Sequence, residues 1–318
     1  HQLRIATDAQ PKEPRGWLTR GALEVELRQA RDAEQSLQNF LNLQGTSEAA
    51  ADDDDEDSDA NRSAQRTQAL LLLSQAAQIR KDLPAANRWL DQIGPINGSL
   101  EVALRRALVW AADGKLRDAR ALIVSLPQSE EVSAKAKTLA ESQVLREAKR
   151  WSEALVLLST ANARAPDDTD LLYERAMLAE KLERHDEVEQ LLRRVIALQP
   201  KHHHAHNALG YALADRNLRL PEARVLVTQA LALAPNDPFI TDSMGWVEFR
   251  LGNIDAALGH LRRAYAQRPD TEIAAHLGEV LWVAGQREQA LRIWKEGRER
   301  EADNEVLRET LKRLQVRL

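Results

Sequence analysis

The spacing of the prolines that end apolar helical stretches constrains this chain more than any other feature. Pro166, Pro200, Pro235 and Pro269 follow one another at intervals of 34, 35 and 34 residues. A fixed period of about 20 to 45 residues is typical of repeat proteins, in which each unit packs only on its neighbours. The chain is therefore expected to be an array of similar units.

Three further sequence positions recur with the same period. A small residue near the start of the second half of each unit forms the first column: Ala33, Ala86, Ala119, Ala154, Val188, Ala223, Ala257 and Ala290. Another small residue, twelve or thirteen positions earlier, forms the second: Gly21, Ser74, Ala107, Ser142, Ala176, Gly210, Gly245 and Gly278. A bulky residue, four positions after the first column, forms the third: Leu37, Leu90, Ile123, Leu158, Leu192, Val227, Leu261 and Trp294. Small residues let two antiparallel helices approach closely, and we expect the bulky residue to fill the groove to the next helix pair.

The clearest copies are HNALGYALADRNLRLPEARVLVTQALALAP, DSMGWVEFRLGNIDAALGHLRRAYAQRP and AAHLGEVLWVAGQREQALRIWKEG. They resemble the tetratricopeptide repeat (TPR), a helix-turn-helix unit of about 34 residues. The resemblance covers about residues 14–303; it is strong from 135 onward and degenerate around 67–131. It implies an all-α superhelical solenoid of about eight helix-turn-helix repeats with a C-terminal capping helix.

One interval between repeats is 53 residues and coincides with the tract TSEAAADDDDEDSDANRS. A low-complexity acidic segment buries little apolar surface, so we expect it to be a disordered insertion. The expected organisation is the tail of a preceding truncated repeat at 1–13, TPR 1 at 14–45, the acidic insertion at 46–64, degenerate TPRs 2 and 3 at 67–134, TPRs 4 to 8 at 135–303, and the capping helix at 304–318.

Composition excludes several classes of function. The formal net charge is −5, and seven acidic residues stand in the one tract, so the remaining sequence is near neutral. Nucleic acid is not expected as a partner, because its phosphates require a basic surface. The absence of cysteine excludes disulfides, zinc-thiolate sites and a cysteine nucleophile. No apolar run is long enough for a membrane span, and because the chain begins at His1, we expect that an upstream targeting segment has been removed.

Motifs for catalysis are missing: there is no H-E-x-x-H, G-x-S-x-G, P-loop or G-x-G-x-x-G. The prediction is a protein that is not an enzyme, with no cofactor and no bound metal. The tract KHHHAH places His202 and His206 four residues apart, which could chelate a metal on a helix. We interpret it instead as an exposed polar turn that begins a helix.

The resemblance also implies where a partner binds. In a TPR unit the first helix lines the inner groove through its second, fifth, ninth, twelfth and thirteenth positions. Large aromatic side chains on such a surface are typical anchors for a partner. The predicted groove residues are Tyr173, Met177, Asn207, Tyr211, Phe239, Asp242, Trp246, Phe249, Arg250 and Trp282. The alternative is that some belong to the core, with Trp282 packed on a neighbouring helix. The two-carboxylate clamp of TPR chaperone adaptors is not expected, since only Asn207 fits its pattern.

Residues from about 200 to 300 resemble a narrower group, the proteobacterial outer-membrane TPR lipoproteins of the LbcA type. That resemblance implies a non-catalytic adaptor that recruits and activates a periplasmic C-terminal processing protease and its substrates. It also implies a periplasmic location at the outer membrane, held by a lipid anchor upstream of this chain. The alternatives are a structural scaffold in an envelope export or assembly complex, or a cytosolic TPR adaptor.

Overall fold

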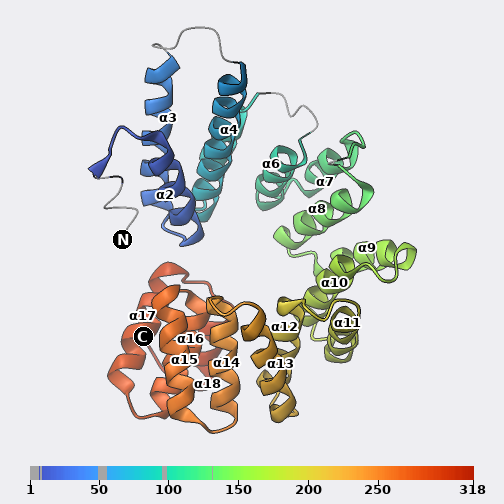
Figure 1. The fold of residues 1–318 in the computed structure, drawn as a ribbon, viewed down its shortest axis with the longest axis vertical. Coiled ribbons are helices and arrows are strands. Elements are labelled where there is room, and N and C mark those ends of the chain that lie inside the picture. The colour runs from blue at the N-terminus through green and yellow to red at the C-terminus, as the bar shows by residue number, and fades with distance from the viewer. Residues whose placement is uncertain (1–6, 8, 49–55, 95–98, 131) are drawn as a thin grey trace. The chain divides into compact units, whose positions relative to one another are not determined.

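The computed structural model describes residues 7, 9–48, 56–94, 99–130 and 132–318, and in these ranges the chain is helical with no strand (Figure 1). It divides into two compact units, 1–161 and 162–318. The first unit contains α2 (Pro14–Glu26), α3 (Ala30–Glu48), α4 (Glu56–Ile79), α5 (Leu83–Asp91), α6 (Leu100–Ala112), α7 (Leu116–Ser125), α8 (Ala134–Glu147) and most of α9 (Trp151–Arg164).

The second unit contains α10 (Thr169–Lys181), α11 (His185–Leu198), α12 (His203–Asp215), α13 (Leu220–Leu233), α14 (Pro238–Arg250), α15 (Ile254–Gln267), α16 (Thr271–Val283), α17 (Arg287–Arg300) and α18 (Glu305–Arg313). From α2 onward the helices pair as α2/α3, α4/α5 and so on to α16/α17, and α18 follows alone. The predicted all-α fold of eight helix pairs with a final single helix is confirmed.

Every turn within a pair contains a residue with a left-handed backbone. The residue is glycine in three turns, including Gly252 (φ 85°) and Gly285 (φ 79°), but Lys149 (φ 56°) and Glu183 (φ 57°) occupy the same place in others. A left-handed residue after a helix lets its N–H groups reach the last carbonyls and stops the helix. This reversal makes the two helices of each pair antiparallel.

The recurring small and bulky columns meet inside each pair. A methyl group added at Gly245 would lie 2.6 Å from Leu261, and one at Gly210 would lie 2.6 Å from Val227. The bulky residue therefore packs on the small residue of its own pair, which corrects the expectation that it fills the groove to the next pair. The close approach of the two helices leaves no other space for the bulky side chain, and Leu261 and Val227 are fully buried.

The acidic tract is helical over more of its length than predicted. Helix α3 continues to Glu48 and α4 begins at Glu56, so residues 46–48 and 56–64 of the expected disordered insertion are helical, while 49–55 lie outside the described residues. Extending an existing helix costs far less than nucleating one, and acidic residues near a helix N-terminus interact favourably with its dipole. The side chain of Gln44 also donates to the carbonyl of Arg62, at 3.4 Å, which joins the two helix ends.

Helix α18 occupies the segment predicted to cap the array. Leu307 is buried, and the Arg313 guanidinium binds both oxygens of Glu279 on α16, at 2.7 and 2.6 Å. Glu279 is only 3% exposed, so this pair compensates a carboxylate that the repeat packing has removed from water. The polar face of α18 remains outward, as a solenoid end requires.

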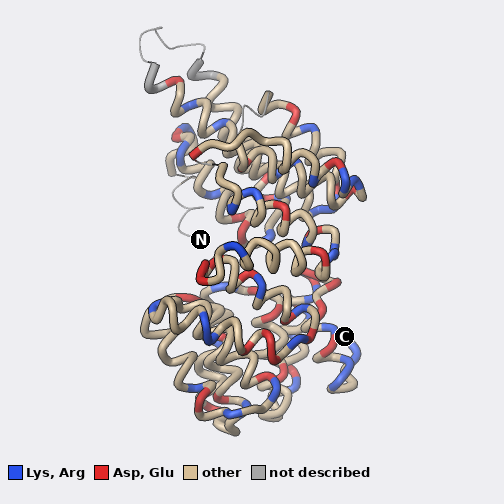
Figure 2. The backbone as a smooth tube through the Cα atoms, turned by 90° about the vertical axis from the view of Figure 1, so that its right-hand side faces the viewer, with Lys and Arg blue, Asp and Glu red and all other residues tan. Residues whose placement is uncertain are grey.

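Charged side chains are interspersed along the helices of each unit, as Figure 2 shows. Many form ion pairs between neighbouring helices, such as Arg224 with Glu248 at 2.8 Å and Arg193 with Glu222 at 2.5 Å. None of the helices in the described ranges is sufficiently long and apolar to cross a membrane.

Candidate protein-binding site

All ten predicted groove residues lie on the first helices of the second unit, and their exposure divides them into three groups. Phe239 is exposed (41%), and its ring lies 5.1 Å from the guanidinium carbon of Arg268. Asp242 and Trp246 are buried, with 6% and 4% exposure. The others are half-buried: Tyr173, Met177, Asn207, Tyr211, Phe249, Arg250 and Trp282.

Three of the predicted residues meet at one point together with a residue that the sequence analysis missed. The Nδ1 atom of His276 on α16 lies 2.8 Å from Oδ2 of Asp242, and its Nε2 atom lies 3.2 Å from the hydroxyl of Tyr211. The indole of Trp246 stacks on the same imidazole, with 4.5 Å between centroids. These four side chains, here called the His276 cluster, come from the neighbouring first helices α12, α14 and α16.

His276 carried one signal that could have revealed it. It lies 34 residues after Asp242, one repeat length, so the two residues occupy related places on successive first helices. The groove-position rule passes over it because its position in the repeat is not one of the five that face the groove. Only the packing of α14 against α16 shows that the two side chains meet.

The burial of Trp246 corrects the expectation that it is an accessible anchor. Besides stacking on His276, its indole N–H donates to Oδ1 of Asp215 at 3.2 Å. Its other ring neighbour is Phe249, with 5.3 Å between centroids. A ring covered on this side by protein cannot offer its area to a partner in this conformation. Trp282 is also partly core, because it packs 5.7 Å from Trp294, as the alternative interpretation held.

Electrostatics in the His276 cluster favour the imidazolium. Burial alone would lower the pKa of His276, but the Asp242 carboxylate, by its charge and its hydrogen bond, outweighs burial, and the pKa is raised. Glu272 and Glu279 on the same helix act in the same direction. Burial raises the pKa of the Tyr211 phenol well above its usual value, and Asp215 adds to that effect, so Tyr211 stays neutral.

This arrangement predicts a loss of stability as the pH rises. A raised folded pKa stabilises the fold fully below the unfolded value of about 6.5, and the contribution disappears as the pH passes through the folded pKa. We expect the free energy of unfolding to fall over this range by about 1.4 kcal/mol for each unit by which the pKa is raised. Chemical denaturation at a series of pH values measures it.

His276→Gln is the matched control, since it should be less stable at pH 6 and lose the slope above pH 6.5. The pKa values of His202, His204 and His260 are lowered, chiefly by burial, so those groups titrate below this window. An unchanged slope in His276→Gln would contradict the assignment.

The histidine tract has structural roles in the described structure. Nδ1 of His202 accepts the backbone N–H of Ala205 at 3.1 Å and so caps α12. His206 is buried, not exposed as predicted, and its Nε2–H donates to the carbonyl of Pro200 at 2.9 Å. Among the described residues, no group of three or more potential ligands is arranged to hold a metal ion.

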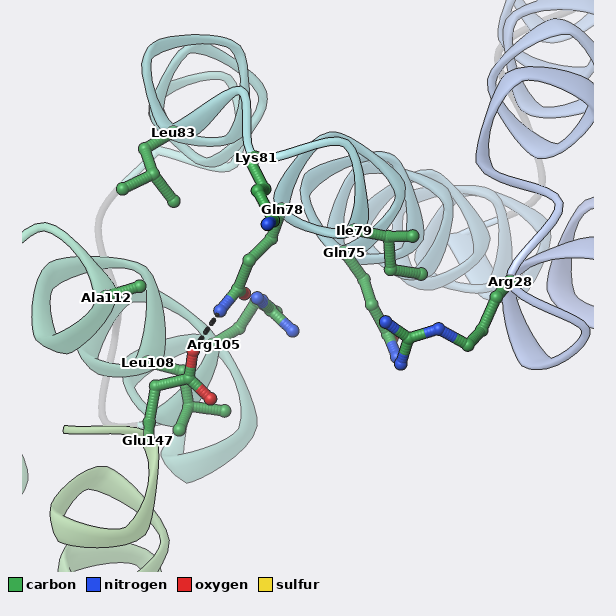
Figure 3. Close-up of a pocket in the computed structure, with 10 residues that line it drawn as sticks. All are labelled: Arg28, Gln75, Gln78, Ile79, Lys81, Leu83, Arg105, Leu108, Ala112 and Glu147. Carbon is green, nitrogen blue, oxygen red and sulfur yellow. Dashed lines mark hydrogen bonds between the residues drawn. The ribbon is translucent and has the colours of Figure 1, made fainter. Parts of the chain in front are cut away.

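The first unit contains a polar pocket of about 590 Å³ that the sequence analysis did not identify (Figure 3). Helices α4, α6 and α8 line it, together with the turns after α2 and α4. Its residues are Arg28, Gln75, Gln78, Ile79, Lys81, Leu83, Arg105, Leu108, Ala112 and Glu147. Six of them stand at the ninth, twelfth or thirteenth position of a first helix, so the groove rule, applied to the degenerate repeats, could have found them.

Comparison with known proteins agrees with the repeat structure. Residues 145–210 match the tetratricopeptide repeat family. A TPR repeat-containing protein of Pseudomonas aeruginosa is 39% identical over 242 residues, an alignment that covers 76% of this chain. The chain spans only 41% of that protein's length.

Solved structures show the same fold. A tetratricopeptide repeat protein from Parabacteroides merdae superposes with a TM-score of 0.56 at 18% identity, covering 78% of this chain and 98% of that one. A thermophilic TPR protein from Thermus thermophilus gives a TM-score of 0.51 at 24% identity, covering 57% of this chain and all of that one. The chain is therefore an all-α protein built of tetratricopeptide-type repeats.

Proposed function

We propose that this chain is a non-catalytic adaptor that binds protein segments along its first helices. The observation that carries the proposal is Phe239, an exposed aromatic ring at a groove position of α14. The core of the unit does not need this ring, whereas a partner would bury it between α14 and the Arg268 side chain. Half-buried Tyr173 and Met177 on α10 extend the apolar surface at equivalent places. Exposed aromatic residues of this kind are frequent binding anchors.

At a finer level, we propose that the chain belongs to an exported lipoprotein at the outer membrane that recruits and activates a periplasmic protease and its substrates. The support is the resemblance of residues 200–300 to lipoproteins of the LbcA type. The similarity to a longer Pseudomonas protein is compatible with a segment upstream that could hold an anchor. A scaffold in an envelope export complex and a cytosolic adaptor are the competing outcomes of the test below.

Phe239→Asp should weaken partner binding by about tenfold or more, because it removes an anchor and places a charge in its contact. Thermal stability should change little, since the ring is exposed. The test is affinity capture from an envelope extract of the parent organism, followed by a peptidase assay of the captured material with and without added adaptor. We expect peptidase activity that the wild-type protein both captures and increases.

Val225→Asp is the matched control, because Val225 is 57% exposed but lies on α13, a second helix. It should capture the peptidase as the wild type does. Equal loss in both variants would place binding on the outer face and contradict the groove. Capture of export components without a peptidase would replace the protease role by the scaffold role.

A further inference from the structure

The pocket of the first unit contains a guanidinium that lacks partners. In Arg105, on α6, the Nε and Nη2 atoms have no solvent contact and no hydrogen-bond partner. Buried donors are almost always paired, and an unpaired one costs about 1–3 kcal/mol. These two atoms are also the adjacent N–H groups of one guanidinium edge, the edge that binds both oxygens of a carboxylate.

The charge around Arg105 is only partly balanced. Burial lowers the pKa of Arg105 to about 10, and the charge of Glu147 opposes that effect. The Glu147 carboxylate instead accepts a hydrogen bond from the side-chain amide of Gln78, at 2.7 Å (Figure 3). Arg28 and Lys81 add positive charge at the rim, so the lining has three cationic residues and one anionic residue.

We propose that this pocket binds a single carboxylate of a protein segment, attached to an apolar side chain, and that the free C-terminus of a polypeptide ending in an apolar residue is its main source. The inference rests on the proposed function, since it names what one part of the groove recognises. The carboxylate pairs with the Nε and Nη2 edge of Arg105, which turns about its last side-chain torsions to bring that edge from its buried position into the cavity.

The lining favours a carboxylate over a more highly charged anion. Glu147 remains in the pocket and repels a second negative charge, so a dianionic phosphate is a poorer fit than a monoanion. Ile79, Leu83, Leu108 and Ala112 give the pocket an apolar wall that phosphate does not use but the last side chain of a peptide does. The amides of Gln75 and Gln78 are placed to donate to the peptide backbone.

The test is a titration of the whole 318-residue protein followed by NMR of its arginine Nε–Hε signals, with Arg105→Lys assigning the signal of Arg105. Four probes separate the sources: Ac-Ala-Ala-Ala-Leu with a free carboxylate, the same peptide as its amide, Ac-Ala-Asp-Ala-Ala-NH2, and inorganic phosphate. We expect saturable shifts of the Arg105 signal with the free carboxylate and weaker ones with the aspartate peptide. The amide should cause none.

Two substitutions should act in opposite directions. Arg105→Gln should abolish saturable binding, and Arg105→Lys, which keeps the charge but not the two-pronged edge, should weaken it about tenfold. Glu147→Gln should tighten it about fivefold by removing the repelling charge. Equal binding of the amide, binding of phosphate alone, or no response in any wild-type titration would each overturn the proposal, whatever the stability of the variants.

Failure here is distinguishable from failure of the adaptor role. Phe239→Asp should bind the free-carboxylate peptide as the wild type does, because Phe239 lies in the second unit. If the peptides fail while capture still depends on Phe239, only the pocket assignment falls. If the peptides bind but no partner is captured through Phe239, the pocket assignment stands without that groove contact.

Discussion

Replacing Trp246 with alanine is expected to lower the free energy of unfolding by about 3 to 5 kcal/mol, the cost of deleting a buried indole. The ring is 4% exposed, stacks on His276 and donates its N–H to Asp215. Its removal leaves a cavity between α14 and α16 and uncovers the buried contact between His276 and Asp242. Thermal unfolding followed by circular dichroism, with denaturant titration, measures the loss.

The same substitution should leave partner binding per folded molecule nearly unchanged, in contrast to Phe239→Asp. Trp246→Phe is the control, because it keeps an aromatic ring beside His276 but loses the hydrogen bond, and we expect it to cost about 1 kcal/mol. A Trp246→Ala protein that melts like the wild type but binds its partner tenfold more weakly would restore the groove role predicted from sequence.

Gly278→Ala is expected to destabilise the protein by about 1 to 3 kcal/mol or more, although it adds a single methyl group. That group would overlap the indole of Trp294, which is fully buried on α17 and donates to the carbonyl of Ala275 at 3.3 Å. Neither the large ring nor the backbone of α16 can move without opening the pair. The midpoint and slope of urea denaturation measure the effect.

Gly259→Ala is the matched control for Gly278→Ala. Gly259 also lies inside a helix, α15, but no atom stands within 4 Å of the added methyl group. There the substitution should stabilise the protein by about 0.5 to 1 kcal/mol, because alanine loses less backbone entropy in a helix than glycine does. Loss of stability at both positions would mean that close approach of the helices is not the cause.

Much of the local structure was predictable from sequence because it depends on neighbours along the chain. The period of 34 residues placed the helix pairs, and the small and bulky columns marked positions that are buried in the structure, such as Ala257 and Leu261. The acidic tract was predicted less well. Its composition favours disorder, but its ends adjoin two long helices that extend into it.

The sequence by itself determined that this is a helical repeat protein and which face of each first helix looks inward, because a repeat restates the same local packing. The tertiary structure alone decided which inward side chains stay accessible. Trp246 is covered by His276 from one repeat further along, whereas Phe239 remains exposed, and no periodic rule distinguishes the two. It also decided that Arg105 lies unpaired in a pocket, since that environment requires side chains from three successive first helices and the turns beside them.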